Sequence, residues 1–127
     1  MLRVMKNLSL KFYIYLISSV GWFISILYLL IFYSNNSSEI SIDHLDKAIH
    51  FTLFFVQAFL ITQAIISYDN RVRTKNLIII FILLIIFGSI MEVQQIYLPM
   101  RKFEYYDLLF NLLGITSGLF CSIYIKN

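Results

Sequence analysis

Long apolar runs constrain this chain more than any other feature. The first extends from Phe12 to Tyr33, 22 residues without a charged side chain, and three further apolar stretches follow it. A helix needs about 20 apolar residues to cross the hydrocarbon core of a bilayer, which is ~30 Å thick. The sequence is 60% hydrophobic and 13% charged, whereas a soluble domain is roughly 45–50% apolar and ~25% charged. We therefore predict an all-α membrane protein, a four-transmembrane-helix bundle.

The predicted bundle forms one domain, residues 1–127, because four spans at about 1.5 Å per residue leave no length for a soluble domain. The expected helices cover about 12–33, 46–68, 77–98 and 106–125. Pro99 is expected to end the third helix, since a proline inside a helix removes a hydrogen bond and clashes with the preceding turn. In the first helix we expect a close-packing face of small residues and one tryptophan: Ser18, Gly21, Trp22 and Ser25.

The basic residues predict that both termini are cytoplasmic, because Lys and Arg prefer the cytoplasmic side of short loops. Basic residues occur in the N-terminal segment, in the second loop and at the C-terminus: Arg3, Lys6, Lys11, Arg71, Arg73, Lys75 and Lys126. Only Arg101 and Lys102 of the third loop go against this trend. The first loop, from Ser34 to Asp46, carries three acids and no Lys or Arg. We therefore expect the first and third loops to face outward. Because the basic residues are scattered and form no patch, no nucleic-acid partner is expected despite a net charge of +3.

Polar residues at helical spacing mark three of the expected helices. Their intervals of three and four residues place them on one stripe of each helix: Asp46, His50 and Gln57; Gly88, Glu92 and Gln95; Asp107, Asn111, Gly114 and Gly118. A charge at the centre of a membrane helix costs ~2.5–3.5 kcal/mol on insertion scales, so such residues are functional-site candidates. The candidate ligand-binding residues are Asp46, Lys47, His50, Glu92, Gln95, Arg101, Asp107 and Asn111. We expect them to converge in one outward-facing pocket.

A structural interpretation remains open beside the functional one. The same residues could form a salt-bridged knot that pins three helices together, at about 0.6 kcal/mol per polar contact. Small residues would pack the helices as well, which favours a site. Gly114 and Gly118 form a GxxxG motif that could mediate a homo-oligomer, but they share the polar stripe of Asp107. We therefore expect them to bring the fourth helix close to its neighbours within one chain.

Four fragments in order resemble the VanZ-like family of small bacterial membrane proteins. They are D-K-x-x-H-x-x-x-F (Asp46, Lys47, His50, Phe54), G-x-x-x-E-x-x-Q (Gly88, Glu92, Gln95), P-x-R (Pro99, Arg101) and D-x-x-x-N-x-x-G-x-x-x-G (Asp107, Asn111, Gly114, Gly118). The chain differs from the family pattern at Glu104, where a small hydroxyl residue is expected. The resemblance implies a multi-pass protein of the bacterial cytoplasmic (inner) membrane, linked to low-level resistance to teicoplanin-type lipoglycopeptides. It does not supply a reaction.

The favoured hypothesis is that the chain binds or shields an anionic lipid headgroup or a lipid-linked cell-wall precursor. Arg101 and Lys47 can hold a phosphate or carboxylate, Arg by a planar two-pronged contact and Lys as a point charge. His50, Glu92, Asp107 and Asn111 would orient them. Membrane lipids are then the expected partners, and neither a cofactor nor a metal is expected.

Two other hypotheses stay open. The first is an enzyme that modifies such a lipid, with His50 as general base or with His50, Glu92 and Asp107 holding a divalent metal. The sequence contains neither H-E-x-x-H nor G-x-S-x-G, the motifs of common zinc and serine hydrolases, so catalysis is less favoured. The second is a proton-coupled transporter, for which only Gln57 and Gln63 continue the polar residues toward the inner side.

Overall fold

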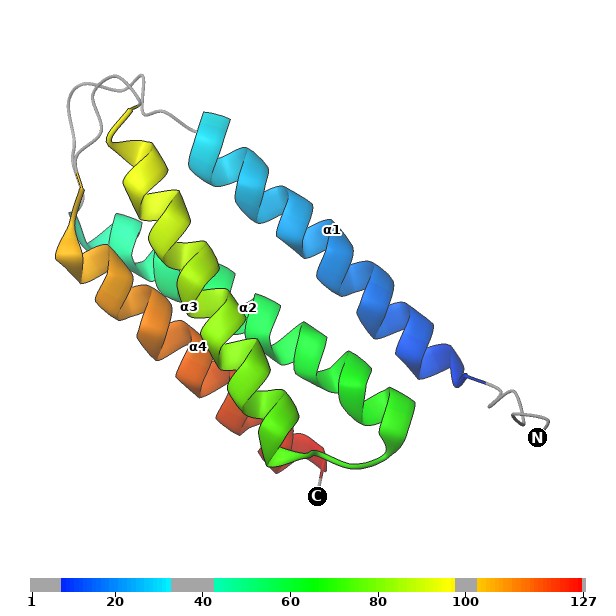
Figure 1. The fold of residues 1–127 in the computed structure, drawn as a ribbon. Coiled ribbons are helices and arrows are strands. Elements are labelled where there is room, and N and C mark those ends of the chain that lie inside the picture. Colours follow the sequence, from blue (N-terminus) through cyan, green and yellow to red (C-terminus); the bar gives the residue numbers. More distant parts are fainter. Residues whose placement is uncertain (1–7, 33–42, 98–102, 127) are drawn as a thin grey trace.

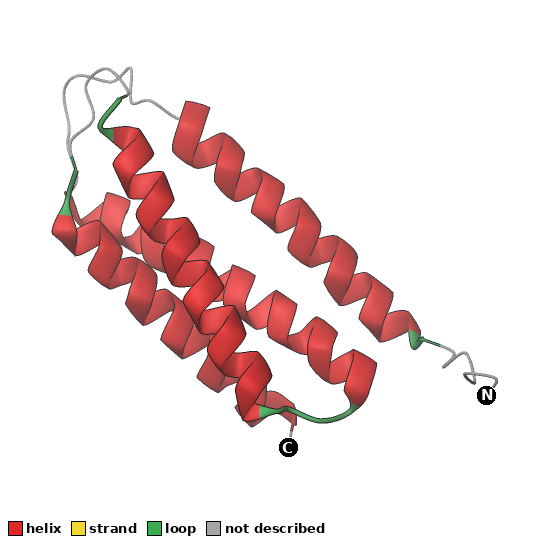
Figure 2. Ribbon diagram, in the orientation of Figure 1, coloured by secondary structure: helices red, strands yellow, loops and turns green. Residues whose placement is uncertain are grey.

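The computed structural model describes residues 8–32, 43–97 and 103–126. They form four α-helices: α1 (Leu10–Phe32), α2 (Asp43–Asp69), α3 (Thr74–Gln95) and α4 (Tyr105–Lys126). The start of α1, the turn between α2 and α3, and the end of α4 lie at one end of the bundle (Figures 1 and 2). Each helix is long and apolar enough to cross a membrane. The all-α architecture with four candidate membrane spans is thus confirmed.

The end of α3 differs from the prediction. The helix stops at Gln95 and not at Leu98. The amide of Ile96 donates to the carbonyl of Val93, and the amide of Tyr97 donates to that of Gln94, both at 3.2 Å. These bonds reach back three residues, so they tighten the last turn in the 3₁₀ manner and end the α-helix. Pro99 lies outside the described residues, and its predicted role is not tested.

A short turn joins α2 to α3. Asn70, directly after α2, has a φ of 53°, a left-handed conformation that asparagine adopts more readily than most residues. Its amide donates to the carbonyl of Ile66 at 2.8 Å, which satisfies one of the last carbonyls of the helix. Across the turn, Nε of Arg73 lies 3.2 Å from Oδ2 of Asp69. The turn therefore reverses the chain within four residues, from Asn70 to Arg73.

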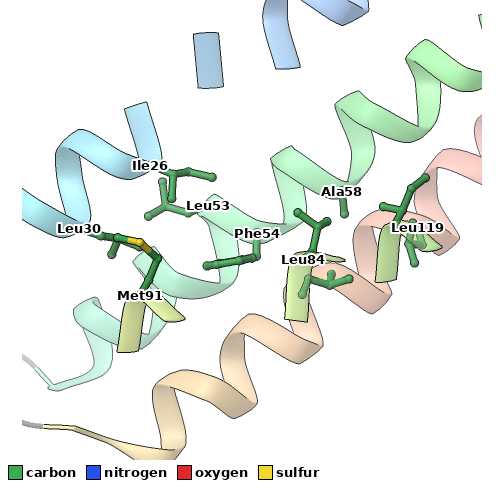
Figure 3. Packing of buried hydrophobic residues seen from close by; sticks show 10 residues of the cluster. Ile26, Leu30, Leu53, Phe54, Ala58, Leu84, Met91 and Leu119 are labelled. Atoms are coloured by element: carbon green, nitrogen blue, oxygen red, sulfur yellow. The ribbon is translucent and has the colours of Figure 1, made fainter. Parts of the chain in front are cut away.

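The second helix is the centre of the bundle. Half of the apolar span of α2 is buried by the rest of the protein, but only 17% of that of α1 is. The apolar core draws on all four helices: Ile26, Leu30, Leu53, Phe54, Ala58, Ile80, Leu84, Met91, Ile115 and Leu119 (Figure 3). Large apolar side chains that point away from this core are exposed along every helix. Such a surface suits a hydrocarbon environment, where apolar groups need no cover from water.

Two glycines bring α4 directly against the backbone of α2. A Cβ atom added at Gly114 would overlap the carbonyl oxygen of Phe51, and one added at Gly118 would overlap that of Phe55. Both pairs advance by four residues, so the two helices run parallel along this contact. The prediction that these glycines serve packing within one chain is confirmed.

The predicted packing face of α1 was wrong for three of its four residues. Ser18, Gly21 and Ser25 are exposed, whereas the buried positions of α1 are Ser19, Ile26 and Leu30. The buried Gln57 of α2 explains the difference, because its Nε2 donates to Oγ of Ser19 at 3.0 Å. Trp22, which the prediction included, donates from Nε1 to the carbonyl of Leu53 at 3.0 Å. Polar groups of α2 that need partners thus set the rotation of α1.

We predict that Gly114→Ala destabilises the bundle and that Gly21→Ala does not. The added methyl at position 114 meets backbone, which cannot rotate away, and overpacking of this kind typically costs ~1–3 kcal/mol. At Gly21 nothing lies within 4 Å of an added Cβ. The free energy of unfolding of each variant is measured by titrating a denaturing detergent into mixed micelles. Equal stabilities would contradict the close approach of α2 and α4.

Candidate functional site

Four buried polar residues meet at one end of the bundle, and we call them the polar cluster: His50, Glu92, Asp107 and Asn111. Each is at most 4% exposed. His50 and Asn111 lie in about the second turn of α2 and α4, Asp107 in the first turn of α4, and Glu92 in the last turn of α3. Part of each of the three predicted stripes therefore meets the other two, at His50, at Glu92, and at Asp107 with Asn111.

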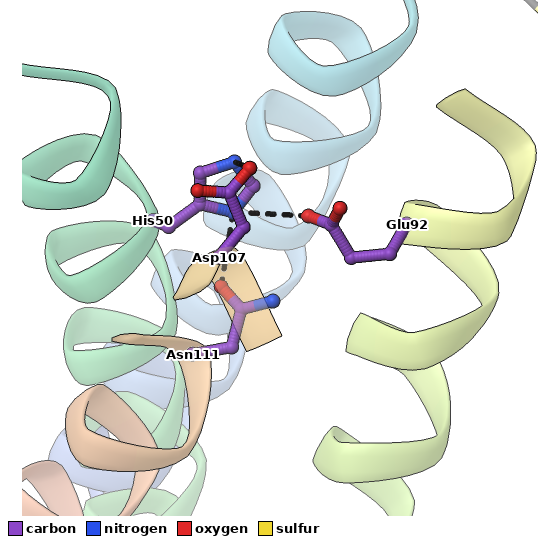
Figure 4. Close-up of polar contacts among 4 residues, drawn as sticks. All are labelled: His50, Glu92, Asp107 and Asn111. Atoms are coloured by element: carbon purple, nitrogen blue, oxygen red, sulfur yellow. Dashed lines mark hydrogen bonds and ion pairs between the residues drawn. The ribbon is translucent and has the colours of Figure 1, made fainter. Parts of the chain in front are cut away.

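The imidazole of His50 is the centre of the polar cluster (Figure 4). Its Nδ1 lies 3.0 Å from Oδ1 of Asn111 and 3.6 Å from Oε1 of Glu92. Its Nε2 lies 3.6 Å from Oδ2 of Asp107. A separation of 3.6 Å is too long for a hydrogen bond. The ring is therefore hydrogen-bonded on one side and only close to a carboxylate on the other.

These contacts select one neutral tautomer of His50. Both groups that face Nδ1, the amide oxygen of Asn111 and the carboxylate of Glu92, are acceptors. Nε2 also faces an acceptor, Asp107, but only Nδ1 lies within hydrogen-bond distance of one. In the neutral ring Nδ1 therefore carries the proton and donates it to Asn111, and Nε2 carries the lone pair on the side of Asp107.

The polar cluster is not a complete hydrogen-bond network. Among the described residues, three of its buried atoms have no hydrogen-bond partner: Nε2 of His50, Oδ1 of Asp107 and Nδ2 of Asn111. Buried polar atoms in proteins are nearly always partnered, and a half-satisfied network is worse than an apolar core. A purely structural knot does not account for this arrangement.

Gly88 makes room for the polar cluster on α3. A Cβ atom at this position would lie 3.2 Å from Nδ2 of Asn111 and 3.2 Å from Cζ of Phe54. Such contacts are tighter than ordinary van der Waals distance, so glycine lets α3 bring Glu92 close to His50. The spacing placed Gly88 on the stripe of Glu92, but its packing role comes from the structure.

Asp46 and Lys47 lie at the rim of the polar cluster. The side chain of Asp46 is exposed, and one of its carboxylate oxygens lies within 4.8 Å of ligand atoms of both His50 and Asp107. Lys47 is half-buried, and its Nζ lies 5.8 Å from the centroid of the Tyr106 ring, within reach of a cation–π interaction. The rim thus carries one negative and one positive side chain.

The two remaining candidate residues stand apart from these contacts. Gln95 is buried one turn after Glu92 and lines a small cavity of about 30 Å³ with Leu30, Ile31, Met91 and Gln94. It thus lies beside α1. Arg101 lies outside the described residues, so its predicted contact with an anion is not tested.

The structure groups the metal-ligand candidates differently from the sequence hypothesis. That hypothesis combined His50 with Glu92 and Asp107. Glu92 faces Nδ1 of the ring and Asp107 faces Nε2, and a carboxylate oxygen of Asp46 lies within 4.8 Å of ligand atoms of both His50 and Asp107. Spacing along α2 placed Asp46 on the stripe of His50, but only the packing shows which carboxylate meets which nitrogen.

The other polar residues named by the sequence hypotheses have structural partners. Oγ of Ser89 donates to the carbonyl of Ile85 at 2.9 Å, within its own helix. Gln57 bonds to Ser19 of α1, and Nε2 of Gln63 donates to the carbonyl of Ser122 of α4 at 3.1 Å. Both glutamines therefore join α2 to its neighbours.

Sequence reasoning missed a groove at the opposite end of the bundle. It has a volume of about 450 Å³ and is lined by residues from α1, the end of α2 and the end of α4, among them Lys11, Tyr15, Gln63 and Tyr68. Lys and Tyr are typical of membrane–water interfaces. In the sequence, the only indication of this groove was the spacing of Lys11 and Tyr15 by four residues, which places both on one face of α1.

Fold and polar cluster together define an all-α protein with four candidate membrane spans and a buried acidic, histidine-centred site at one end. Comparisons with family models, with curated proteins and with solved structures give no match.

We predict that the neutral ring of His50 carries its proton on Nδ1. Nitrogen NMR of the histidine side chains distinguishes the two tautomers, and His44→Gln leaves His50 as the one histidine of the chain. Asn111→Ala removes an acceptor worth about 1 kcal/mol, so the population with the proton on Nε2 should rise severalfold. A ring with its proton on Nε2 in the parent protein would contradict the assignment.

Proposed function

We propose that this chain is a VanZ-like multi-pass protein of the bacterial cytoplasmic membrane whose polar cluster binds an anionic lipid headgroup or a lipid-linked cell-wall precursor. The observation that carries the proposal is the depth of the polar cluster. Buried polar side chains from three helices meet within about two turns of the bundle's end. In a bilayer this depth adjoins the headgroup region.

The unpartnered atoms of the polar cluster support a ligand. Buried Nε2 of His50 and Oδ1 of Asp107 have no hydrogen-bond partner among the described residues. Hydroxyl or ammonium groups of a headgroup that reaches them from the end of the bundle would donate hydrogen bonds to both acceptors, which a structural knot does not. The two glutamines farther along α2 differ from His50 because each donates its Nε2 N–H to a neighbouring helix, although Oε1 of Gln57 has no partner among the described residues.

Cations at the rim support an anionic ligand. Lys47 lies over the ring of Tyr106, between His50 and the start of α2. Arg101, two residues beyond Pro99 in the sequence, adds a second cation by the sequence hypothesis. A phosphate between them would gain charge-assisted hydrogen bonds, which are about twice as strong as neutral ones. A precursor bound in this way would be shielded from a lipoglycopeptide, which explains a link to resistance.

The orientation of the chain follows from the same proposal. Arg71, Arg73 and Lys75 lie at or beside the turn between α2 and α3, at the end of the bundle opposite the polar cluster. By the preference of basic residues for the cytoplasm, that turn and both termini are cytoplasmic. The polar cluster then faces the outer leaflet, where wall precursors are used.

We predict that loss of a rim cation weakens lipid retention and lipoglycopeptide protection. Losing a charge-assisted contact typically costs ~1.5–3 kcal/mol, about 10- to 150-fold in affinity. Lys47→Gln and Arg101→Ala should show this loss, and Arg101→Lys should restore only part of it because the two-pronged geometry is gone.

Lys75→Gln is the matched control, because it removes an exposed lysine at the opposite end of the bundle. Native mass spectrometry measures retained lipid, and teicoplanin susceptibility of expressing cells measures protection. Full retention in Arg101→Ala at normal expression would contradict anion binding by that residue.

We predict that a cysteine at Asn36 reacts with an impermeant thiol reagent from outside and that one at Thr74 reacts only from the cytoplasmic side. Thr74 begins α3 beside the basic turn, and Asn36 belongs to the acidic first loop. Cys121→Ser removes the native thiol. The reverse labelling pattern would place the polar cluster at the inner leaflet and overturn the proposed orientation.

A further inference from the structure

We infer that Asp46, His50 and Asp107 form a binding site for one divalent transition-metal ion, with Zn²⁺ as the best fit. One oxygen of each carboxylate and one nitrogen of the imidazole lie within 4.8 Å of one another. The three residues come from the first two turns of two adjacent helices, α2 and α4. Asp46 is exposed and His50 and Asp107 are buried, so the site has an open side through which an ion can enter.

The separation of Nε2 of His50 from Oδ2 of Asp107 suits two ligands of one ion. At 3.6 Å the atoms do not form a hydrogen bond. Zinc binds histidine nitrogen and carboxylate oxygen at about 2.0–2.2 Å. An ion ~2.1 Å from both atoms would subtend an angle of about 118°, close to the tetrahedral value. These two ligands therefore need almost no movement, and the exposed carboxylate of Asp46 can rotate to complete the set.

The partners of His50 orient the ring for metal binding. Nδ1 donates to Oδ1 of Asn111, so Nε2 offers its lone pair on the side of Asp107. Histidine ligands of metals almost always donate their other ring N–H to a carbonyl or carboxylate in this way. Asn111 therefore acts as a positioning residue.

The buried charge of Asp107 independently supports a metal ion at this site. Asp107 is 2% exposed, its Oδ1 has no hydrogen-bond partner among the described residues, and neither does Nε2 of the 1% exposed His50. Buried charges in proteins are either paired or bound to metals, because an isolated one is too costly in a medium of low dielectric constant. A divalent ion would neutralise the carboxylates of Asp46 and Asp107 together.

The donor set selects the kind of metal. One imidazole nitrogen with two carboxylate oxygens suits Zn²⁺ and its neighbours among the first-row metals. Mg²⁺ and Ca²⁺ prefer oxygen ligands. Three protein ligands leave a fourth position of a tetrahedral ion open. If the proposed function is right, a phosphate oxygen of the headgroup takes this position, which reconciles an acidic cluster with an anionic ligand.

The test is Zn²⁺ binding by the full chain, purified in mild detergent without a histidine tag. After treatment with a chelator and addition of Zn²⁺, elemental analysis measures the bound metal and titration calorimetry the affinity. We expect one Zn²⁺ per chain, not displaced by excess Mg²⁺. Asp46→Asn and Asp107→Asn should each weaken binding at least 10-fold, and Asn111→Ala about 10- to 100-fold, as for other groups that orient a ligand.

Glu104→Gln is the matched control, because it removes a carboxylate three residues before Asp107 that does not belong to the set. The Zn²⁺ affinity of the Glu104→Gln variant should stay within threefold of that of the parent protein. Asp46 is exposed, so Asp46→Asn remains decisive even if Asp107→Asn does not fold. Binding equally weakened by Glu104→Gln and Asp46→Asn, or less than 0.2 Zn²⁺ per parent chain, would overturn the proposal.

Lipid retention in the same samples separates this proposal from the proposed function. Zinc that binds with no lipid retained supports the metal site and contradicts headgroup binding. Lipid retained equally with and without zinc, in a chain that binds no zinc, supports headgroup binding and overturns the metal site.

Discussion

The contact between the backbones of α2 and α4 governs the rest of this structure. Gly114 and Gly118 lie against the carbonyls of Phe51 and Phe55, and this contact fixes the register of two parallel helices. A slip of one turn in one direction would bring Phe110 against Phe51, where no side chain fits. The register in turn places Asp107 and Asn111 beside His50. The close packing of α2 against α4 therefore also determines the geometry of the polar cluster.

Much of this arrangement could be predicted from the sequence. Run lengths gave four spans, and spacing by three and four residues put His50, Glu92, Asp107 and Asn111 on facing stripes. The face of α1 was missed because helical spacing fixes a face only relative to its own helix, and the bond from Gln57 to Ser19 sets the rotation between helices. The pairing of carboxylates with the two nitrogens of His50 likewise depends on how α3 and α4 are rotated relative to α2. Spacing within one helix could not predict it.

The buried polar side chains of α2 differ in the kind of group that they contact. Gln57 and Gln63 each give an amide N–H to a neighbouring helix, to Ser19 and to the carbonyl of Ser122. Such bonds are typical of polar contacts that hold membrane helices together. His50 has one satisfied nitrogen and one that faces a carboxylate without a hydrogen bond. The same helix thus uses amides for assembly and an imidazole for a site.

The hydrogen bonds that α2 makes to α4 have a consequence for the synthesis of the chain. Ser122, whose carbonyl receives Gln63, follows it by 59 residues, which at about 5–20 residues per second corresponds to ~3–12 s of synthesis. During that interval His50 and Gln63 lack their partners from α4. Nascent α2 must therefore be sheltered by the insertion machinery or by early contact with α1, through Trp22 and Ser19. A chain that stalls before α4 would keep these groups of α2 without their partners.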